Sequence, residues 1–582
     1  MSILSEILDD IFKVLSITET VNRNPQKDDL SEKNCFEVWK IDSEVQERNF
    51  QREINFYIYF DEYFPISIPR VYLSQKSYDD VKYIPHVDKD RLICIFHTEE
   101  LILDQNNPLG IVQVCLKKAK KIISDGLNKT NFSDFQDEFG AYWTDNNEND
   151  TIQYLSLVTD FPKENQLLKI LKLNKTYNRI NYLLYNENSP TSKLFMDFLS
   201  QNGYIGTSSD ALYLADIKID PIPPFSIDNE FILNTLSTIS LTTFKRYINS
   251  PKIIEKYIFF LATTTTNPIL IGWKHRMLIT NRKGFRNGIL SPFEVLSKLQ
   301  KKDKVIKILL NEYSNNRIEK RTSGVIYKKY NFLIAGLGSI GSNLIFFLNG
   351  INYPDFKFID SDSIKIENIG RHLLGINDIN KSKTEALKTY IKNIRPDQNV
   401  LIKNKNLESI VLKNITFFND CTYAFIAIGN QNVENLILSL HVSGIITVPM
   451  FFLWVEPYAL GGHCVFLHPE DKVTMEELYE QNLYRFNIID PLEYVKGNPI
   501  LSKQEAGCQT AFMPYSENDI LLFLSSIYKL INNIIHNDIK QSQITQWVGN
   551  VPFALEMGIT LNEKFSTMEP YCNETLILHN GN

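Results

Sequence analysis

Residues 331–348 constrain the fold of this chain more than any other stretch. The pattern predicts a buried strand at Asn331–Ala335, and the glycine-rich turn GLGSIG at 336–341 leads directly into an apolar, helix-compatible run at 342–348. A strand, a glycine turn and a helix in this order suit phosphate binding, because glycines permit a tight turn and let backbone N–H groups approach an anion closely. The stretch therefore predicts a nucleotide site.

A polar and cationic series follows the second predicted strand, 356–359. Asp360 ends that strand, where a carboxylate can bind ribose hydroxyls. Hydride transfer has no evident need for the cations beyond it, whereas attack of a carboxylate on the α-phosphate of a triphosphate builds charge that Arg, Lys and a metal ion neutralise. The residues of the predicted site are Gly336, Gly338, Gly341, Asp360, Asp362, Asn368, Arg371 and Lys383.

Three short segments of this series resemble the signature of the ThiF-type adenylation domain, shared by ubiquitin-activating enzymes and the bacterial ThiF and MoeB proteins. They are DSD at 360–362, NIGR at 368–371 and KSK at 381–383, and the resemblance covers roughly residues 310–582. It implies a Rossmann-like fold with ATP and Mg²⁺ as cofactors. It also implies ribose contact by Asp360, and phosphate or metal contact by Asp362, Asn368, Arg371 and Lys383.

The expected metal ligand is Asp362. Relatives usually place a second ligand, an aspartate, where this chain has Gly429. Either Asp362 and water complete the Mg²⁺ shell, or the domain has lost adenylation. The retained Arg371 and Lys383 favour the first reading.

The chain as a whole has the composition of several globular domains. Its 582 residues are too many for one core and suggest three or four domains. A balance of 61 Lys and Arg against 68 Asp and Glu gives a net charge of −7, which does not favour general nucleic-acid binding. Without a secretory signal or an apolar stretch of membrane-spanning length, we expect a cytoplasmic protein with no membrane contact. The seven cysteines include no CxxC pair, so no zinc site is expected.

Residues 1–150 form the first predicted domain, an α+β fold. Alternating strands at 36–41 and 54–60 lead to Cys94, which precedes an amphipathic run at 111–123. This stretch is similar to ubiquitin-conjugating enzymes, in which a sheet leads through a histidine to an Ile-Cys active site, and the resemblance implies a catalytic Cys94. An aromatic run at 135–143 is expected to close the domain by packing.

The first domain departs from the conjugating pattern ahead of its cysteine. His86 is followed by Val87 and Asp88, so the asparagine that would steady an oxyanion is missing. His86 and His97 are further candidates for the site, although a histidine near a turn is more often a hydrogen-bonded surface residue. Residues 151–310 are interpreted as an α/β linker domain without identifiable chemistry, and residues 311–582 as the adenylation domain.

Cys508 lies in the glycine-flanked segment AGCQTAF at 506–512, ahead of an amphipathic helix at 518–535 that Ser516 is expected to cap. The segment resembles that of the catalytic cysteine in the activating family, where a mobile Cys-x-Thr loop precedes a helix. A nucleophilic thiolate needs access, which a glycine-flanked turn provides. The resemblance implies a thioester on Cys508 and a homodimer through the adenylation domain.

These features together suggest a relay in one α/β multidomain chain. ATP adenylates the C-terminal carboxylate of a protein tail, Cys508 and then Cys94 carry the acyl group, and a lysine of a target protein finally attacks. The domain order is similar to the activating–conjugating fusion family of bacterial CBASS antiphage operons, which implies that the tail belongs to a cGAS-like nucleotidyltransferase.

Three alternatives remain at this point. The close one is a fusion that serves a bacterial ubiquitin-like modifier. Gly429 and the missing asparagine motivate a second, a non-catalytic scaffold that binds nucleotide and tail. A dehydrogenase is the third, and it leaves Arg371, Lys383 and Cys508 without a use.

Overall fold

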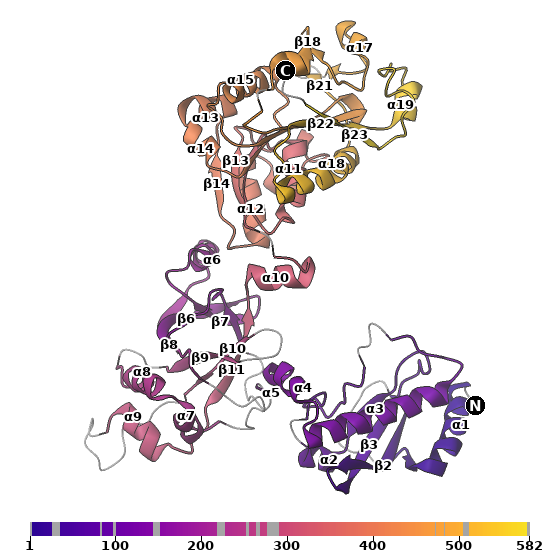
Figure 1. The fold of residues 1–582 in the computed structure, drawn as a ribbon, viewed down its shortest axis with the longest axis vertical. Coiled ribbons are helices and arrows are strands. Elements are labelled where there is room, and N and C mark those ends of the chain that lie inside the picture. The colour runs from indigo at the N-terminus through magenta and orange to yellow at the C-terminus, as the bar shows by residue number, and fades with distance from the viewer. Residues whose placement is uncertain are drawn as a thin grey trace. The chain divides into compact units, whose positions relative to one another are not determined.

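The computed structural model describes residues 3–25, 35–81, 84–96, 101–143, 152–217, 227–251, 255–262, 268–275, 290–326, 328–471, 473–481, 483–504 and 511–578. The chain forms two compact units, Met1–Glu187 with Tyr204–Glu312 and Asn188–Gly203 with Tyr313–Asn582. The first unit contains a four-stranded sheet and a closed barrel, and the second contains an eight-stranded sheet (Figure 1).

The four-stranded sheet is antiparallel, and its strands follow chain order. They are β1 (Thr20–Arg23), β2 (Glu37–Glu47), β3 (Phe50–Phe60) and β4 (Arg70–Leu73). Alternate residues of β2, Trp39 and Ile41 among them, enter a core that α1 (Ile3–Thr18) and α3 (Pro108–Asn128) cover. The short helix α2 (Gln75–Asp80) follows β4. This arrangement leaves Cys94 in the connection between β4 and α3.

The barrel closes through the order β10-β11-β5-β7-β6-β8-β9. Its strands are β5 (Gln153–Ser156), β6 (Gln166–Tyr177), β7 (Ile180–Tyr185), β8 (Gly206–Tyr213), β9 (Tyr257–Ala262), β10 (Ile269–Lys274) and β11 (Ile306–Glu312). Closure pairs the edges that an open sheet would expose. The helices α7 (Asn229–Thr235) and α8 (Thr238–Ile248) pack their apolar residues on the outside of this barrel, and α9 (Pro292–Glu294) precedes β11.

The aromatic run at 135–143 forms two short helices, α4 (Phe132–Asp137) and α5 (Phe139–Trp143). The run does pack, but not where the sequence predicted. Phe139 and Trp143 belong to the apolar cluster of the barrel, and the indole N–H of Trp143 donates to the carbonyl oxygens of Gly272 (3.1 Å) and Ile308 (3.0 Å). The prediction that this run closes the first domain is therefore wrong for Phe139 and Trp143, because their rings are buried against β9, β10 and β11.

The eight-stranded sheet has the order β14-β13-β12-β15-β16-β17-β22-β23, with its first five strands parallel and the rest antiparallel. These strands are β12 (Asn331–Ala335), β13 (Asp355–Ile359), β14 (Val400–Lys403), β15 (Tyr423–Ile426), β16 (Met450–Val455), β17 (Gly461–Leu467), β22 (Gln543–Val548) and β23 (Asn573–Ile577). The chain runs from β12 outward to β14 and then returns to β15 on the other side of β12. Ligands bind at such a reversal, beyond the carboxyl ends of the strands.

Helices cover both faces of this sheet (Figure 1). Along β12, Phe332 and Ile334 enter the core under α11 (Ser339–Asn349), α12 (Lys383–Ile394) and α18 (Glu517–Asn537). Leu333 and Ala335 enter the opposite core under α13 (Leu407–Lys413), α14 (Ile415–Asn419) and α15 (Gln431–Val442). The other helices of this unit are α6 (Pro190–Gln201), α10 (Asn315–Thr322), α16 (Met475–Leu478), α17 (Pro491–Val495) and α19 (Val551–Glu556). No helix in the described ranges is both long and apolar enough to cross a membrane.

Candidate active site

The glycine-rich loop joins β12 to α11 at the reversal point of the sheet. Gly336 has φ +85°, and a Cβ at this position would overlap the carbonyl oxygen of Ala427 at the end of β15. A Cβ at Gly341 would overlap the carbonyl oxygen of Gly336. Gly338 is the N-cap of α11, and the space beyond its missing side chain is open. The first two glycines thus allow close backbone packing, and the third leaves a helix N-terminus accessible to an anion.

A pocket of about 290 Å³ lies beside this loop. Five of the predicted site residues line it, namely Gly336, Gly338, Asp360, Asp362 and Lys383. Gly341 lies behind the loop, in the first turn of α11, and shapes the pocket only through Gly336. The structure therefore gathers five of the eight predicted residues in one place, with Gly341 in a supporting position.

Two carboxylates and one ammonium organise the pocket. The Asp360 carboxylate accepts hydrogen bonds from the backbone N–H groups of Leu337 and Asp362, both at 2.7 Å. Lys383, the first residue of α12, places its Nζ 2.9 Å from Asp362 and 3.7 Å from Asp360 while only 7% of the residue is exposed. Its charge is held beside the glycine loop, where it can meet phosphate oxygens.

Asn368 and Arg371 are not among the residues that line this pocket. The Asn368 side chain accepts a hydrogen bond from the backbone N–H of Lys365 (2.9 Å) and stabilises its own short turn. The Arg371 guanidinium lies 5.0 Å above the ring of Tyr515, whose hydroxyl is 2.9 Å from Ser339 Oγ in the glycine loop. Asn368 therefore stabilises the turn before Arg371 and does not line the pocket. Arg371 is held beside the glycine loop by its contact with Tyr515.

Cys508 lies outside the described residues, but the chain on either side of it is placed. Lys503–Gln504 pairs antiparallel with Ala511–Phe512, as β20 and β21. Tyr515 follows, tied to Ser339 and Arg371, and Ser516 forms a capping box with Asp519 at the start of α18, which confirms the predicted cap. Tyr515, seven positions downstream of Cys508, thus contacts the glycine loop.

Cys94 is exposed in the first unit. Its backbone N–H donates to the carbonyl oxygen of His86 (2.7 Å). The pKa of the Cys94 thiol is raised, mainly because the sulfur is partly desolvated. The negative charges of Asp88 and Glu138 raise it further. At neutral pH Cys94 is therefore mainly a thiol, and a reaction in which its sulfur acts as a nucleophile requires a base to remove the proton.

His86 stands beside Cys94 and is held by two carboxylates. Its Nδ1 lies 2.7 Å from Glu138 Oε1 and its Nε2 3.4 Å from Asp134 Oδ2. The hydrogen bond to Glu138 is the main cause that raises the pKa of His86. His97, the other histidine candidate, lies outside the described residues. The acidic pair was not found from the sequence, because it lies some 50 positions downstream in α4 and at its end.

The protonation of His86 provides a test of this cluster. A raised pKa in the folded state means that the ion pair stabilises the fold fully below the ordinary pKa of about 6.5 and loses this contribution as the pH rises through the raised value. We expect Glu138→Gln to lower the pKa of His86 in an NMR titration of the full chain, and Asp134→Asn, at the longer contact, to lower it less. An equal pKa in wild type and Glu138→Gln would contradict the assignment.

The donor set of the nucleotide pocket fits Mg²⁺ bound jointly with a nucleotide. Asp362 and Glu408 both line the pocket and offer the carboxylate oxygens that Mg²⁺ prefers. Throughout the described ranges, no group of three or more His, Cys, Asp or Glu side chains could hold a metal ion by itself. Mg²⁺ commonly takes one or two carboxylates and completes its shell with water and phosphate oxygens. When bound, the ion would neutralise charge on the phosphates.

Several pocket residues were missed from the sequence. Lys405, Asn406 and Glu408 follow β14, and Asn430 follows β15 and caps α15. The signal for the first three was present, since polar residues after a parallel strand reach the same edge as Asp360. Tyr515 had no such signal, because 176 positions separate it from Ser339.

Comparison with known families agrees with this geometry. Residues 18–152 match the family model for prokaryotic E2 proteins of family B, and residues 326–505 match the model for the ThiF family. The chain joins an E2-like domain to a ThiF-family domain. The predicted order of a conjugating-like domain ahead of a ThiF-type domain is thereby confirmed, as is the α/β multidomain fold class.

Individual relatives cover the ThiF-family domain in part. A probable molybdopterin-synthase adenylyltransferase from Porphyra purpurea is 36% identical over 84 residues, which are 14% of this chain and 22% of that protein. The match therefore spans less than a quarter of the relative.

Solved structures are similar at a lower level. The crystal structure of PaaA shares 14% identity at a TM-score of 0.30, over 46% of this chain and 74% of its own. E. coli MccB, solved with AMPCPP and MccA, shares 13% identity at a TM-score of 0.26, over 37% of this chain and 60% of its own.

Proposed function

We propose that this chain activates the C-terminal carboxylate of a protein tail with ATP and conjugates it to an amine. The observation that carries the proposal is the pocket in which the glycine loop, Asp360, Asp362 and Lys383 meet. The tail carboxylate attacks the α-phosphate, pyrophosphate leaves, and an acyl-adenylate forms. Lys383 and Arg371 are the cations that neutralise the developing charge, and Asp362 is the Mg²⁺ ligand.

The acyl group then moves through two thioesters. The Cys508 thiolate attacks the acyl carbon and releases AMP, and Cys94 takes the acyl group from Cys508 by thiol exchange. A lysine amine of the target protein finally attacks the Cys94 thioester, forms an isopeptide bond and frees the thiol. Each exchange replaces one difficult acylation by an easier step. The exposed Cys94 and the contact of Tyr515, seven positions after Cys508, with the glycine loop support this order.

The tail is proposed to belong to a cGAS-like nucleotidyltransferase in antiphage defence, with the chain acting as a homodimer through its adenylation domain. The close alternative is the tail of a bacterial ubiquitin-like protein. A neighbouring gene for a nucleotidyltransferase would favour the first source of the tail, and a neighbouring gene for a ubiquitin-like protein would favour the second. A non-catalytic scaffold is the remaining alternative, and Gly429, which offers no metal ligand, is the feature that favours it.

The relay is tested with the two cysteine variants and the product of the neighbouring gene. With Mg²⁺ and ATP, Cys94→Ala is expected to accumulate a thiol-sensitive adduct on Cys508 and to form no isopeptide product. Cys508→Ala is expected to form neither thioester while retaining tail-dependent pyrophosphate exchange. Intact-mass measurement with and without reductant distinguishes these states.

Two outcomes would contradict the relay. Loss of every thioester in Cys94→Ala would reverse the order of the two cysteines. Tight ATP binding without pyrophosphate exchange for any tail would leave the scaffold as the function. Cys572→Ala serves as the control, since this half-buried cysteine lies outside both sites.

A further inference from the structure

A second pocket lies on the other side of the loop between β15 and α15. Its volume is about 280 Å³, close to the 290 Å³ of the nucleotide pocket. Gly429 and Gln431 line this pocket, whereas the adjacent Ile428 and Asn430 line the nucleotide pocket. The same short loop therefore forms a wall of both.

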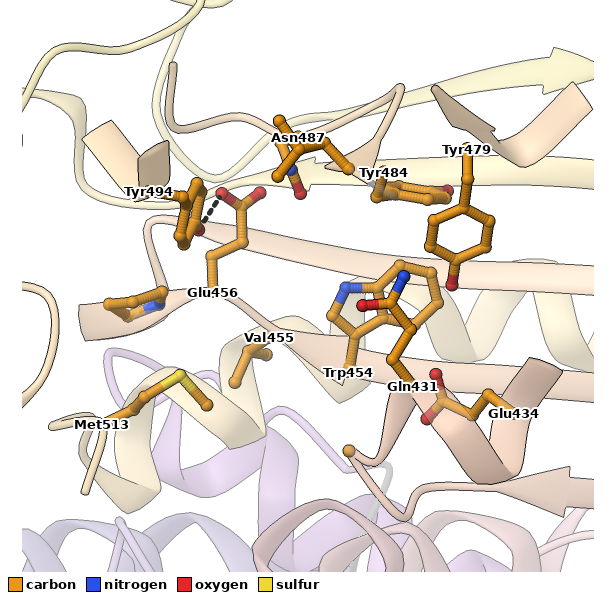
Figure 2. Close-up of a pocket in the computed structure, with 13 residues that line it drawn as sticks. Gln431, Glu434, Trp454, Val455, Glu456, Tyr479, Tyr484, Asn487, Tyr494 and Met513 are labelled. Carbon is orange, nitrogen blue, oxygen red and sulfur yellow. Dashed lines mark hydrogen bonds between the residues drawn. The ribbon is translucent and has the colours of Figure 1, made fainter. Parts of the chain in front are cut away.

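Aromatic rings make up the walls of this second pocket. Trp454, from β16, meets Tyr484 edge-to-face with ring centroids 4.8 Å apart, and Tyr479 packs against Tyr484 at 5.6 Å. Tyr494 also lines the pocket. Figure 2 shows the three tyrosines on one side of the pocket and Gln431, Glu434 and Met513 on the opposite side. We call this site the aromatic pocket.

The two acidic residues of the aromatic pocket do not make it a cation site. The Glu456 carboxylate accepts hydrogen bonds from the backbone N–H groups of Ile488 (2.7 Å) and Ile489 (2.9 Å) and from the Tyr494 hydroxyl (2.9 Å), so it holds the wall together. It also lies 2.7 Å from His463 Nε2. Glu434 is only 7% exposed, and burial raises its pKa to about 7. The surroundings thus favour an uncharged occupant, and an acidic side chain would be repelled.

The aromatic pocket is lined both by the loop of the nucleotide pocket and by the described chain downstream of Cys508. On one side it borders the nucleotide loop at Gly429. On the other it is lined by Met513, a 46% exposed residue that follows β21 and stands five positions after Cys508. Because the loop at 428–431 lines both pockets, a tail whose carboxylate is adenylated in the nucleotide pocket can place one of its preceding residues in the aromatic pocket.

We propose that the aromatic pocket receives a large apolar or aromatic side chain from the last few residues of the activated tail. This inference rests on the proposed function and names the class of tail that the site accepts. Burial of such a side chain against Trp454 and Tyr479 holds the tail while its carboxylate is adenylated and its acyl group is then transferred to Cys508. Tails with Asp or Glu at that position are excluded, because an acidic side chain would lose its hydration among aromatic rings beside the Glu456 carboxylate.

The test uses the full chain and a display library of short peptides with free C-terminal carboxylates, randomised at their last positions. Wild type, loaded with a non-hydrolysable ATP analogue, is expected to enrich Phe, Tyr, Trp, Leu or Met at one fixed position and to deplete Asp and Glu there. Gln431→Trp places a bulky ring in the aromatic pocket and is expected to weaken this preference at least about tenfold, the size of effect seen when a side-chain pocket loses its fit.

Asn432→Trp is the matched control. It adds the same side chain on the neighbouring exposed position of α15, outside the lining of the pocket, and is expected to keep the wild-type preference. ATP affinity is measured for all three proteins and is expected to be equal. A wild type without positional preference, or a Gln431→Trp variant that keeps it, overturns the proposal.

Pyrophosphate exchange with the enriched peptides separates this proposal from the proposed function. Peptides that bind through the aromatic pocket but support no exchange would overturn adenylation and leave the pocket assignment standing. Exchange that proceeds equally with Gln431→Trp and without the preference would overturn the pocket assignment alone.

Discussion

Replacement of Lys383 by alanine is expected to lower tail-dependent pyrophosphate exchange by about 10²–10³-fold, the loss typical of removing one preorganised donor from a site of developing charge. The ammonium is buried at the start of α12, within 4 Å of both Asp360 and Asp362. Its removal takes a cation from the phosphates and also leaves two carboxylates facing them without compensation. The measurement is exchange of labelled pyrophosphate into ATP at saturating ATP and tail.

Lys405→Ala is the control for this prediction. Lys405 lines the same pocket but is exposed, so water screens its charge and replaces it at little cost. We expect a loss of less than about tenfold, in line with the small contribution of exposed ion pairs. Equal losses in the two variants would mean that the pocket responds only to net charge and not to the placed ammonium of Lys383.

Gly341→Ala is expected to have the second large effect, on nucleotide binding and stability together. The new Cβ would overlap the carbonyl oxygen of Gly336, a backbone atom that cannot move without displacing the loop from Ala427. Overpacking of this kind costs about 1–3 kcal/mol. We expect a lower midpoint of thermal unfolding for the ThiF-family domain and, in calorimetric titration, ATP affinity reduced by about tenfold or more.

Gly338→Ala separates packing from ligand contact in the same loop. The space around Gly338 is open and its φ of −77° suits any residue, so the folding stability should stay near that of wild type. Its methyl group would point into the region that the phosphates are proposed to occupy, so ATP affinity should still fall. Gly341→Ala with a wild-type midpoint of thermal unfolding would refute the close-packing role given to that glycine.

The nucleotide half of the site could be predicted because its residues lie close together in the sequence. Gly336, Asp360 and Lys383 follow one another along a single strand–helix–strand unit, where local pattern dictates which edge of the sheet each residue reaches. The cap of α18 was predictable for the same reason, since Ser516 and Asp519 are three positions apart.

The remainder depends on contacts between distant segments, which no local pattern encodes. The barrel pairs β11 with β5, across about 150 positions, and the sequence between them suggested only a linker domain. Tyr515 reaches Ser339, and Met513 meets Gly429 across the aromatic pocket, through packing of the whole second unit. Arg371 was predicted as a phosphate residue from its motif, but only the structure reveals that its guanidinium lies on the Tyr515 ring.

The burial of Trp143 has a consequence for how this protein can be divided for expression. Its indole N–H donates to the backbone of two barrel strands, β10 and β11. The part of the chain that packs on the barrel therefore begins near Phe139, ahead of β5. A fragment that is meant to carry Cys94 alone but extends through Trp143 would take two large aromatic side chains from the barrel core into water. A barrel fragment that starts at β5 would lack them. The natural cut between the two modules therefore falls between Glu138, which clamps His86, and Phe139, the first residue of α5.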